Sequence, residues 1–97
     1  MEFSEKVYWI TKKIPIGKVS TYKEIAKKLN CKAYRAVGNA LNKNCNKDVP
    51  CHRVIKSNGF AGDFNAGNKK KIELLRKEGI GIKNGKIDLR RYGYDNW

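Results

Sequence analysis

The chain has 97 residues, 40% of them hydrophobic, which is enough for one domain with a single core and not for a second core. Lysine and arginine number 22 against 9 acidic residues, and the formal net charge of +13 favours polyanionic partners, nucleic acid above all. The first ten residues lack the apolar centre of a signal peptide, and no run is long enough to span a bilayer. We therefore expect a cytoplasmic protein with reduced cysteines and no membrane partner, although a lysine-rich surface also serves solubility or heat resistance.

Apolar residues at helical spacing predict two helices in the first third of the chain. The first covers residues 3–14, with Ser4 as its N-terminal cap and Pro15 as its end. The second begins near Thr21. Thr21 and Glu24 have the spacing of a capping box, in which each of the two side chains satisfies an unpaired backbone N–H group at the start of a helix.

A third helix is predicted over residues 33–41, after a break at residues 30–31. Two short helices joined by a tight turn in a basic chain are typical of a helix-turn-helix, although many helical hairpins never contact DNA. Arg35 lies where such a helix would meet DNA, but it could also be a solvated charge or the partner of Glu24. Tyr22, at the start of the second helix, could equally be a core residue.

The second half of the chain predicts shorter elements. A short strand is expected over residues 51–56, an irregular loop over residues 60–67, a helix over residues 68–77 and an Asn-Gly hairpin over residues 80–87. The predicted fold is therefore mainly α. It is one winged helix-turn-helix-like domain over residues 1–97, with a short active-site strand and a small C-terminal hairpin.

The segment Val-Pro-Cys-His-Arg-Val, residues 49–54, places a thiol beside a fixed cation and the only histidine of the chain. Basic neighbours lower the pKa of a thiol, so His52 and Arg53 are expected to favour a thiolate nucleophile at Cys51. An unreactive core side chain is an equally good interpretation of a lone cysteine. On a strand, Cys51 and His52 would point to opposite faces, so a turn or a bridging water would have to carry a proton between them.

Metal binding and disulfide formation are weaker interpretations of the cysteines. Cys31, Cys45, Cys51 and His52 could supply four zinc ligands, but their spacing fits no compact zinc motif, and we expect no metal. A disulfide between Cys45 and Cys51 is not expected in a reducing compartment.

Five segments of the chain occur in a known order and spacing. They are Gly-Lys-Val-Ser-Thr-Tyr at residues 17–22, Arg-Ala-Val-Gly-Asn-Ala-Leu at residues 35–41, Asn44, Pro-Cys-His-Arg-Val at residues 50–54, and Leu-Leu followed by Glu-Gly within residues 74–79. Together they resemble the O6-alkylguanine-DNA alkyltransferases, also called methylated-DNA–protein-cysteine methyltransferases, over about residues 3–92. The Pro-Cys-His-Arg-Val segment is the most specific of the five.

The resemblance implies a DNA repair reaction at Cys51. This residue would accept the alkyl group of O6-alkylguanine irreversibly, so that each molecule would react once and need no cofactor. His52 would act as a water-mediated base oriented by Glu78, and Asn44 would help to hold the active-site turn. Tyr22 would donate a hydrogen bond to N3 of the guanine and crowd a phosphate to assist base flipping.

The resemblance also implies how a monomer would hold double-stranded DNA that contains O6-alkylguanine. Arg35 would enter the minor groove and fill the space left by the extruded base, which offsets part of the cost of flipping. Further DNA contacts would come from Thr21, Ala36, Gly38 and Asn39. The base pocket would be formed by the backbone of Cys51 and Val54, which would bind the exocyclic amine, and by Phe64, Asn65 and Ala66 near O6.

The chain departs from the family pattern in three places. The N-terminal domain that usually precedes this one is expected to be absent. Residues 64–66 differ from those more often found in the pocket loop, and Asn44 is followed by Cys45 rather than proline. Both differences bear on the range of alkyl groups that the protein would accept. One alternative is an alkyltransferase-like protein, which flags the lesion for other repair machinery and typically has tryptophan in place of Cys51. The second alternative is a winged-helix transcriptional regulator, in which Cys51 and His52 would have no role.

Overall fold

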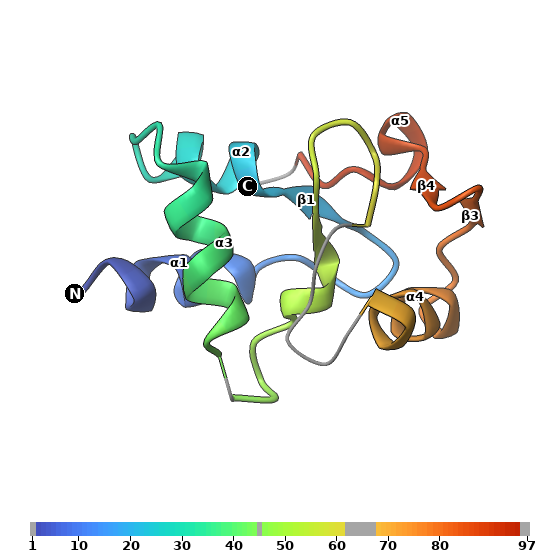
Figure 1. The fold of residues 1–97 in the computed structure, drawn as a ribbon, viewed down its shortest axis with the longest axis horizontal. Helices are drawn as coiled ribbons and strands as arrows, with labels where there is room; N and C mark the ends of the chain where they lie inside the picture. Colours follow the sequence, from blue (N-terminus) through green and yellow to red (C-terminus); the bar gives the residue numbers. More distant parts are fainter. Residues whose placement is uncertain (1, 45, 62–67, 96–97) are drawn as a thin grey trace.

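The computed structural model describes residues 2–44, 46–61 and 68–95, and the fold is mainly helical, as the sequence predicts (Figure 1). In chain order, the elements are α1 (Phe3–Thr11), β1 (Ser20–Thr21), α2 (Tyr22–Lys28), α3 (Tyr34–Asn42), the 3₁₀ turn η1 (Cys51–Arg53), β2 (Val54–Ile55), α4 (Asn68–Lys77), β3 (Ile82–Lys83), β4 (Lys86–Ile87) and α5 (Leu89–Tyr92). None of the described helices is long and apolar enough to cross a membrane.

The first helix is shorter than the sequence predicts. It ends at Thr11 rather than residue 14, and its N-cap is Glu2 rather than Ser4. The chain after Thr11 tightens into i→i+3 hydrogen bonds, including one of 3.1 Å from the Ile14 amide to the Thr11 carbonyl. Ile14 nevertheless remains buried, so the apolar spacing identified a core residue correctly and placed the helix end too late.

Helices α2 and α3 form the predicted helical hairpin. Thr21 caps α2, because its Oγ1 accepts a hydrogen bond of 3.0 Å from the Glu24 amide. The turn between the helices passes through Asn30, which has a left-handed φ of 56°. A Cβ atom added to Gly38 of α3 would lie 3.8 Å from the Tyr22 ring, so the two helices approach closely at the start of α2.

The predicted strand over residues 51–56 is only partly correct. Cys51–Arg53 forms a 3₁₀ turn instead, closed by a 3.0 Å hydrogen bond from the Arg53 amide to the Pro50 carbonyl, and the strand proper is Val54–Ile55. This strand pairs in parallel with β1, which the sequence did not predict, in the register Ser20 to Val54. Because Cys51 and His52 lie on a turn, the alternation of strand side chains does not apply to them.

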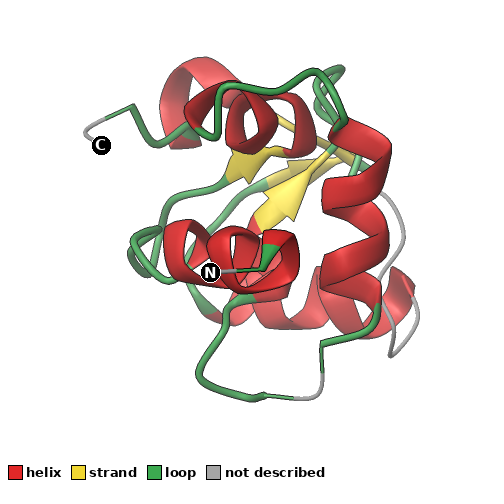
Figure 2. Cartoon of the chain, turned by 90° about the vertical axis from the view of Figure 1, so that its left-hand side faces the viewer, coloured by secondary structure: helices red, strands yellow, loops and turns green. Residues whose placement is uncertain are grey.

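The small parallel pair lies among the helices (Figure 2). The buried side chains of the domain form two groups, and β2 contributes to both. Val54 and Ile55 are neighbours on β2 and belong to different groups, as the alternation of side chains on a strand requires. The group around Val54 contains Cys51 together with residues of α1, α2 and α3. The Cys51 thiol therefore belongs to the same core as the first three helices.

The predicted C-terminal hairpin is confirmed as β3 and β4, which pair in antiparallel fashion around Asn84 and Gly85, both with positive φ. It is attached to the rest of the domain by a 2.8 Å hydrogen bond from the Ile87 amide to the Gly59 carbonyl. Helix α5, which the sequence did not predict, follows, and a bridge between Val19 and Gly93 joins the chain end to the segment before β1.

Candidate functional site

The thiol of Cys51 is buried and held by an amide side chain. Asn44 Nδ2 lies 3.0 Å from Cys51 Sγ and 2.9 Å from the Asn46 carbonyl oxygen, and it donates to both. In return, the Asn46 amide donates to Asn44 Oδ1 at 3.1 Å. Asn44 thus fixes its own loop and presents a donor to the sulfur.

Glu78, just after α4, holds both residues that follow the cysteine. His52 Nε2 lies 2.9 Å from Glu78 Oε2, and the Arg53 guanidinium donates to both carboxylate oxygens at 2.9 and 2.7 Å. Arg53 Nη1 also donates to the Ile14 carbonyl at 2.8 Å. Burial pushes the pKa of Glu78 upward, but the hydrogen bonds from Arg53 and His52 outweigh it and hold the pKa below its ordinary value.

A fully buried lysine completes the surroundings of the thiol. Lys71 of α4 is 0% exposed, and its Nζ donates to the Val54 carbonyl at 2.7 Å and to the Tyr22 hydroxyl at 3.2 Å. The sequence prediction missed Lys71, because three consecutive lysines suggest a solvated face. Its burial could have been predicted from its spacing, because residues four and seven positions apart lie on the same side of a helix, and Lys71 precedes Leu75 by four residues and Glu78 by seven.

The prediction that His52 and Arg53 give Cys51 a lowered pKa is wrong. Burial raises the pKa of the thiol, while the hydrogen bond from Asn44 and the charge of Lys71 act in the opposite direction without cancelling it. His52 and Arg53 do not supply the expected effect, because both side chains are bonded to Glu78. Burial is thus the dominant influence on the pKa of this thiol.

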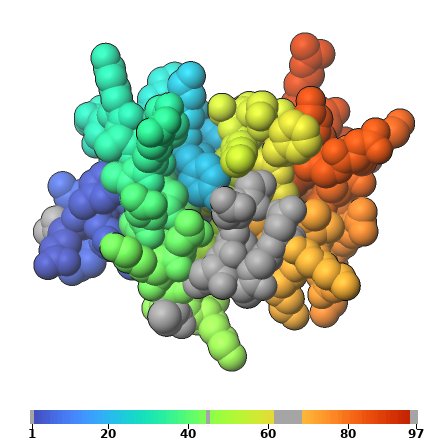
Figure 3. Space-filling model, in the orientation of Figure 1, coloured from blue at the N-terminus to red at the C-terminus, as the bar shows by residue number. Residues whose placement is uncertain are grey.

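Four of the six predicted DNA-contacting residues line a cavity of about 570 Å³ between α3 and the segment after β2. Tyr22, Arg35, Gly38 and Asn39 line it, and so does Lys56, whereas Thr21 and Ala36 do not. In the space-filling view, α3 and the segment after β2 flank the hollow, with the start of α2 between them (Figure 3). Phe64, Asn65 and Ala66 lie outside the described residues.

The sequence matches the model of the DNA-binding domain of 6-O-methylguanine DNA methyltransferase over residues 2–80. The chain belongs to this family. It is 48% identical over 81 residues to a methylated-DNA–protein-cysteine methyltransferase of Saccharolobus solfataricus, covering 82% of this chain and 52% of the relative. It is 42% identical over 93 residues to a bifunctional methyltransferase/endonuclease of Picrophilus torridus, covering 94% of this chain and 31% of the relative. The chain thus spans about half the length of these curated relatives, or less.

Among solved structures, the methyltransferase fold of this chain is similar to that of S. pombe Atl1 in complex with damaged DNA containing O6-carboxymethylguanine. The TM-score is 0.87 at 36% sequence identity, and the match covers 96% of this chain and 94% of Atl1. The match to Atl1 therefore includes the C-terminal hairpin, which lies beyond the residues matched by the family model.

The residues predicted from the methyltransferase resemblance separate into two groups in space. Asn44, His52 and Glu78 gather around the cysteine turn, whereas Arg35 and Asn39 lie on α3 at the cavity. Val54 is fully buried, and its carbonyl already accepts from Lys71, which leaves one acceptor position of that oxygen for another donor. No group of three or more metal-ligating side chains occurs in the described part of the chain.

Proposed function

We propose that the protein repairs DNA by transferring an alkyl group from O6 of a guanine in duplex DNA to Cys51, once per molecule. The observation that supports this most strongly is the setting of the thiol. A hydrogen-bond donor lies 3.0 Å from the sulfur, and the ammonium of a fully buried lysine acts on the pKa of the thiol from the same interior. Both features stabilise a thiolate, and an inert core cysteine needs neither.

The proton of the thiol passes through a water molecule to His52. Its Nε2 faces Glu78, and Nδ1, which has no hydrogen-bond partner among the described residues, accepts the proton, while the carboxylate stabilises the resulting imidazolium. The sulfur attacks the alkyl carbon, and the carbon–sulfur bond forms as the bond between that carbon and O6 breaks. The guanine leaves as an anion and takes up one proton afterwards.

Tyr22 stabilises the leaving guanine by donating a hydrogen bond to N3. Its hydroxyl oxygen accepts from Lys71 Nζ at 3.2 Å, and a phenol that accepts from a cation is a stronger donor through its own hydrogen. Lys71 thus assists both the nucleophile and the leaving group, because its charge also favours the thiolate of Cys51.

The guanine reaches Cys51 only when it leaves the base stack, which costs a few kcal/mol. Arg35 fills the vacated space from the minor groove, and Tyr22 crowds the phosphate of the flipped nucleotide. Lys23 and Lys56 line the same cavity and bind phosphates without regard to sequence, as a lesion that occurs anywhere requires. Thr21, Ala36, Gly38 and Asn39 provide the remaining contacts of the helical hairpin.

The test is the mass of the peptide that contains Cys51 after incubation with duplex DNA containing O6-methylguanine. We expect this peptide to gain one methylene, in a molar amount equal to the protein. Cys51→Ala should bind the same duplex and gain nothing. Methylation at Cys31 or Cys45 instead, or turnover beyond one methyl group per molecule, would contradict the proposal.

A second candidate is a lesion-binding protein that flags O6-alkylguanine for other repair machinery without efficient transfer. Two observations favour it: the match to Atl1 over nearly the whole of both chains, and the raised pKa of Cys51. The same experiment separates the candidates. Tight binding of the modified duplex with an unmodified Cys51 peptide selects the binding protein over the transferase.

A further inference from the structure

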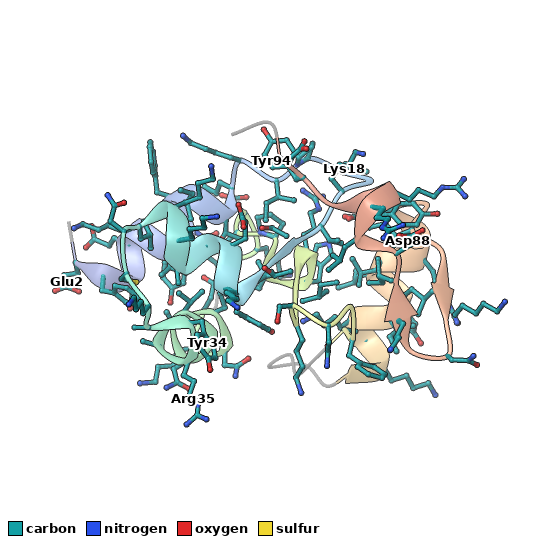
Figure 4. All side chains as sticks on the ribbon, turned by 90° about the horizontal axis from the view of Figure 1, so that it is seen from above. Glu2, Lys18, Tyr34, Arg35, Asp88 and Tyr94 are labelled. Atoms are coloured by element: carbon teal, nitrogen blue, oxygen red, sulfur yellow. The ribbon has the colours of Figure 1, made fainter. Side chains whose placement is uncertain are left out.

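Tyr34 is an exposed aromatic residue beside the proposed base-flipping arginine. It is the first residue of α3, with Arg35 next, and Figure 4 shows both residues at the edge formed by this helix, with Arg35 projecting away from the ribbon. Tyr34 is 48% exposed. Within the described part of the chain, neither side chain makes a hydrogen bond or an ion pair.

Tyr34 also forms the wall between two cavities. On one side lies the cavity of Tyr22 and Arg35. On the other lies a cavity of about 660 Å³ that is lined by Tyr34 and by three lysines, Lys23, Lys27 and Lys32. Lys23 lines both cavities, so positive charge continues across the aromatic ring from one to the other. A phosphate backbone that follows these lysines crosses Tyr34 next to the point where Arg35 enters the duplex.

We infer that Tyr34 is a second residue that opens the duplex, by stacking its ring on a base next to the gap. This inference rests on the proposed base-flipping function. When one base leaves the stack, its neighbours lose a partner face, which a positioned aromatic ring replaces. Stacking is independent of sequence because every base has a π face, and this suits a protein that acts on lesions in any context.

A structural role is the competing explanation, because Tyr34 also lies against the cavity that contains Ala26 and Cys31. The two roles differ in what they affect. A structural defect would reduce reaction with duplex DNA and with the free base alike, whereas a stacking defect reduces only reaction with duplex. The measured quantity is therefore the ratio of the rate of Cys51 alkylation by duplex O6-methylguanine to the rate with the free base O6-methylguanine.

The experiment compares Tyr34→Ala with Tyr34→Phe, which keeps the ring and removes the hydroxyl. We expect Tyr34→Ala to lower the ratio and the affinity for the lesion duplex by about 5- to 100-fold, and Tyr34→Phe to restore most of both. Trp9→Ala is the matched control, since Trp9 is 52% exposed on α1 and lines neither cavity. With 2-aminopurine next to the lesion, the wild-type protein should quench its fluorescence more than Tyr34→Ala does.

Three results would overturn the inference: an unchanged ratio in Tyr34→Ala, an equal loss in Tyr34→Phe, or the same loss in Trp9→Ala. Failure of the proposed function has a different signature. In that case Cys51 of the wild-type protein stays unmodified by duplex and by free base, and the affinity and fluorescence measurements still decide the role of Tyr34.

Discussion

The side chains around Cys51 are held by hydrogen bonds within the protein, whereas Tyr34 and Arg35 at the start of α3 make none among the residues that the structure describes. Asn44, Glu78 and Lys71 each make at least two hydrogen bonds within the protein. This difference fits the proposed function, in which the groups around Cys51 must keep their geometry while a bond is exchanged, and Tyr34 and Arg35 must remain available to DNA.

Glu78→Gln should have the largest effect, because one carboxylate serves both Arg53 and His52. Loss of the charge weakens the hydrogen bonds of a largely buried pair, and we expect about 2–3 kcal/mol less stability in denaturant unfolding. Transfer to Cys51 should fall as well, because the imidazolium of His52 loses its counter-charge. The matched control is Glu73→Gln, an exposed carboxylate on α4, which should change neither quantity.

The same substitution changes the pH dependence of stability. Because the pKa of Glu78 is lowered on folding, the unfolded chain takes up this proton first as the pH falls. The contribution of Glu78 is complete above its ordinary pKa of 4.5 and is lost as the pH falls through the lower value of the folded protein. Unfolding free energies of Glu78→Gln should lack this acid-side loss. A parallel loss in both proteins would show that Glu78 does not determine it.

Arg35→Ala tests the role of the unbonded side chains at the start of α3. We expect reaction with duplex DNA to fall by about 10- to 100-fold, because nothing then fills the gap in the stack, and reaction with the free base to change much less. Arg76→Ala, which removes an exposed arginine of α4, is the control for lost charge. Equal losses with duplex and free base would rule out the gap-filling role and would place Arg35 with the groups around Cys51.

Lys71→Met should have a smaller effect, on the thiol itself. The charge of Lys71 lowers the pKa of Cys51, so its removal should raise that pKa further and slow alkylation of Cys51 at neutral pH by about tenfold. The rate of modification by iodoacetamide as a function of pH, measured on the Cys51 peptide, reports this change directly. Lys70→Met, on the exposed part of the same helix, should leave the profile unchanged.

The sequence predicted the position of Arg35 on α3 better than the hydrogen-bonded interior around Cys51. Helical spacing and the Thr21 cap located α2 and α3, and these local signals were enough to place Arg35 at the start of a helix. The interior depends on contacts between distant segments. The parallel pairing of two-residue strands, the 3₁₀ turn at Cys51 and the burial of Lys71 against Val54 leave no local periodicity. The raised pKa of Cys51 follows from burial of the thiol itself, which also depends on distant segments.

Lys23→Ala should have the smallest effect. It tests whether the surface around Tyr34 and Arg35 binds DNA through charge as well as through stacking. Lys23 lines both cavities beside Tyr34, so it lies where a phosphate would cross from one to the other. Loss of one phosphate contact should reduce the slope of log affinity against log salt by about 0.9 and weaken binding only a few-fold, equally for modified and unmodified duplex. Lys12→Ala, beyond the end of α1, lines neither cavity and should leave the slope unchanged. If both variants change the slope by the same amount, the net charge of +13 attracts DNA as a diffuse field, and Lys23 has no phosphate of its own.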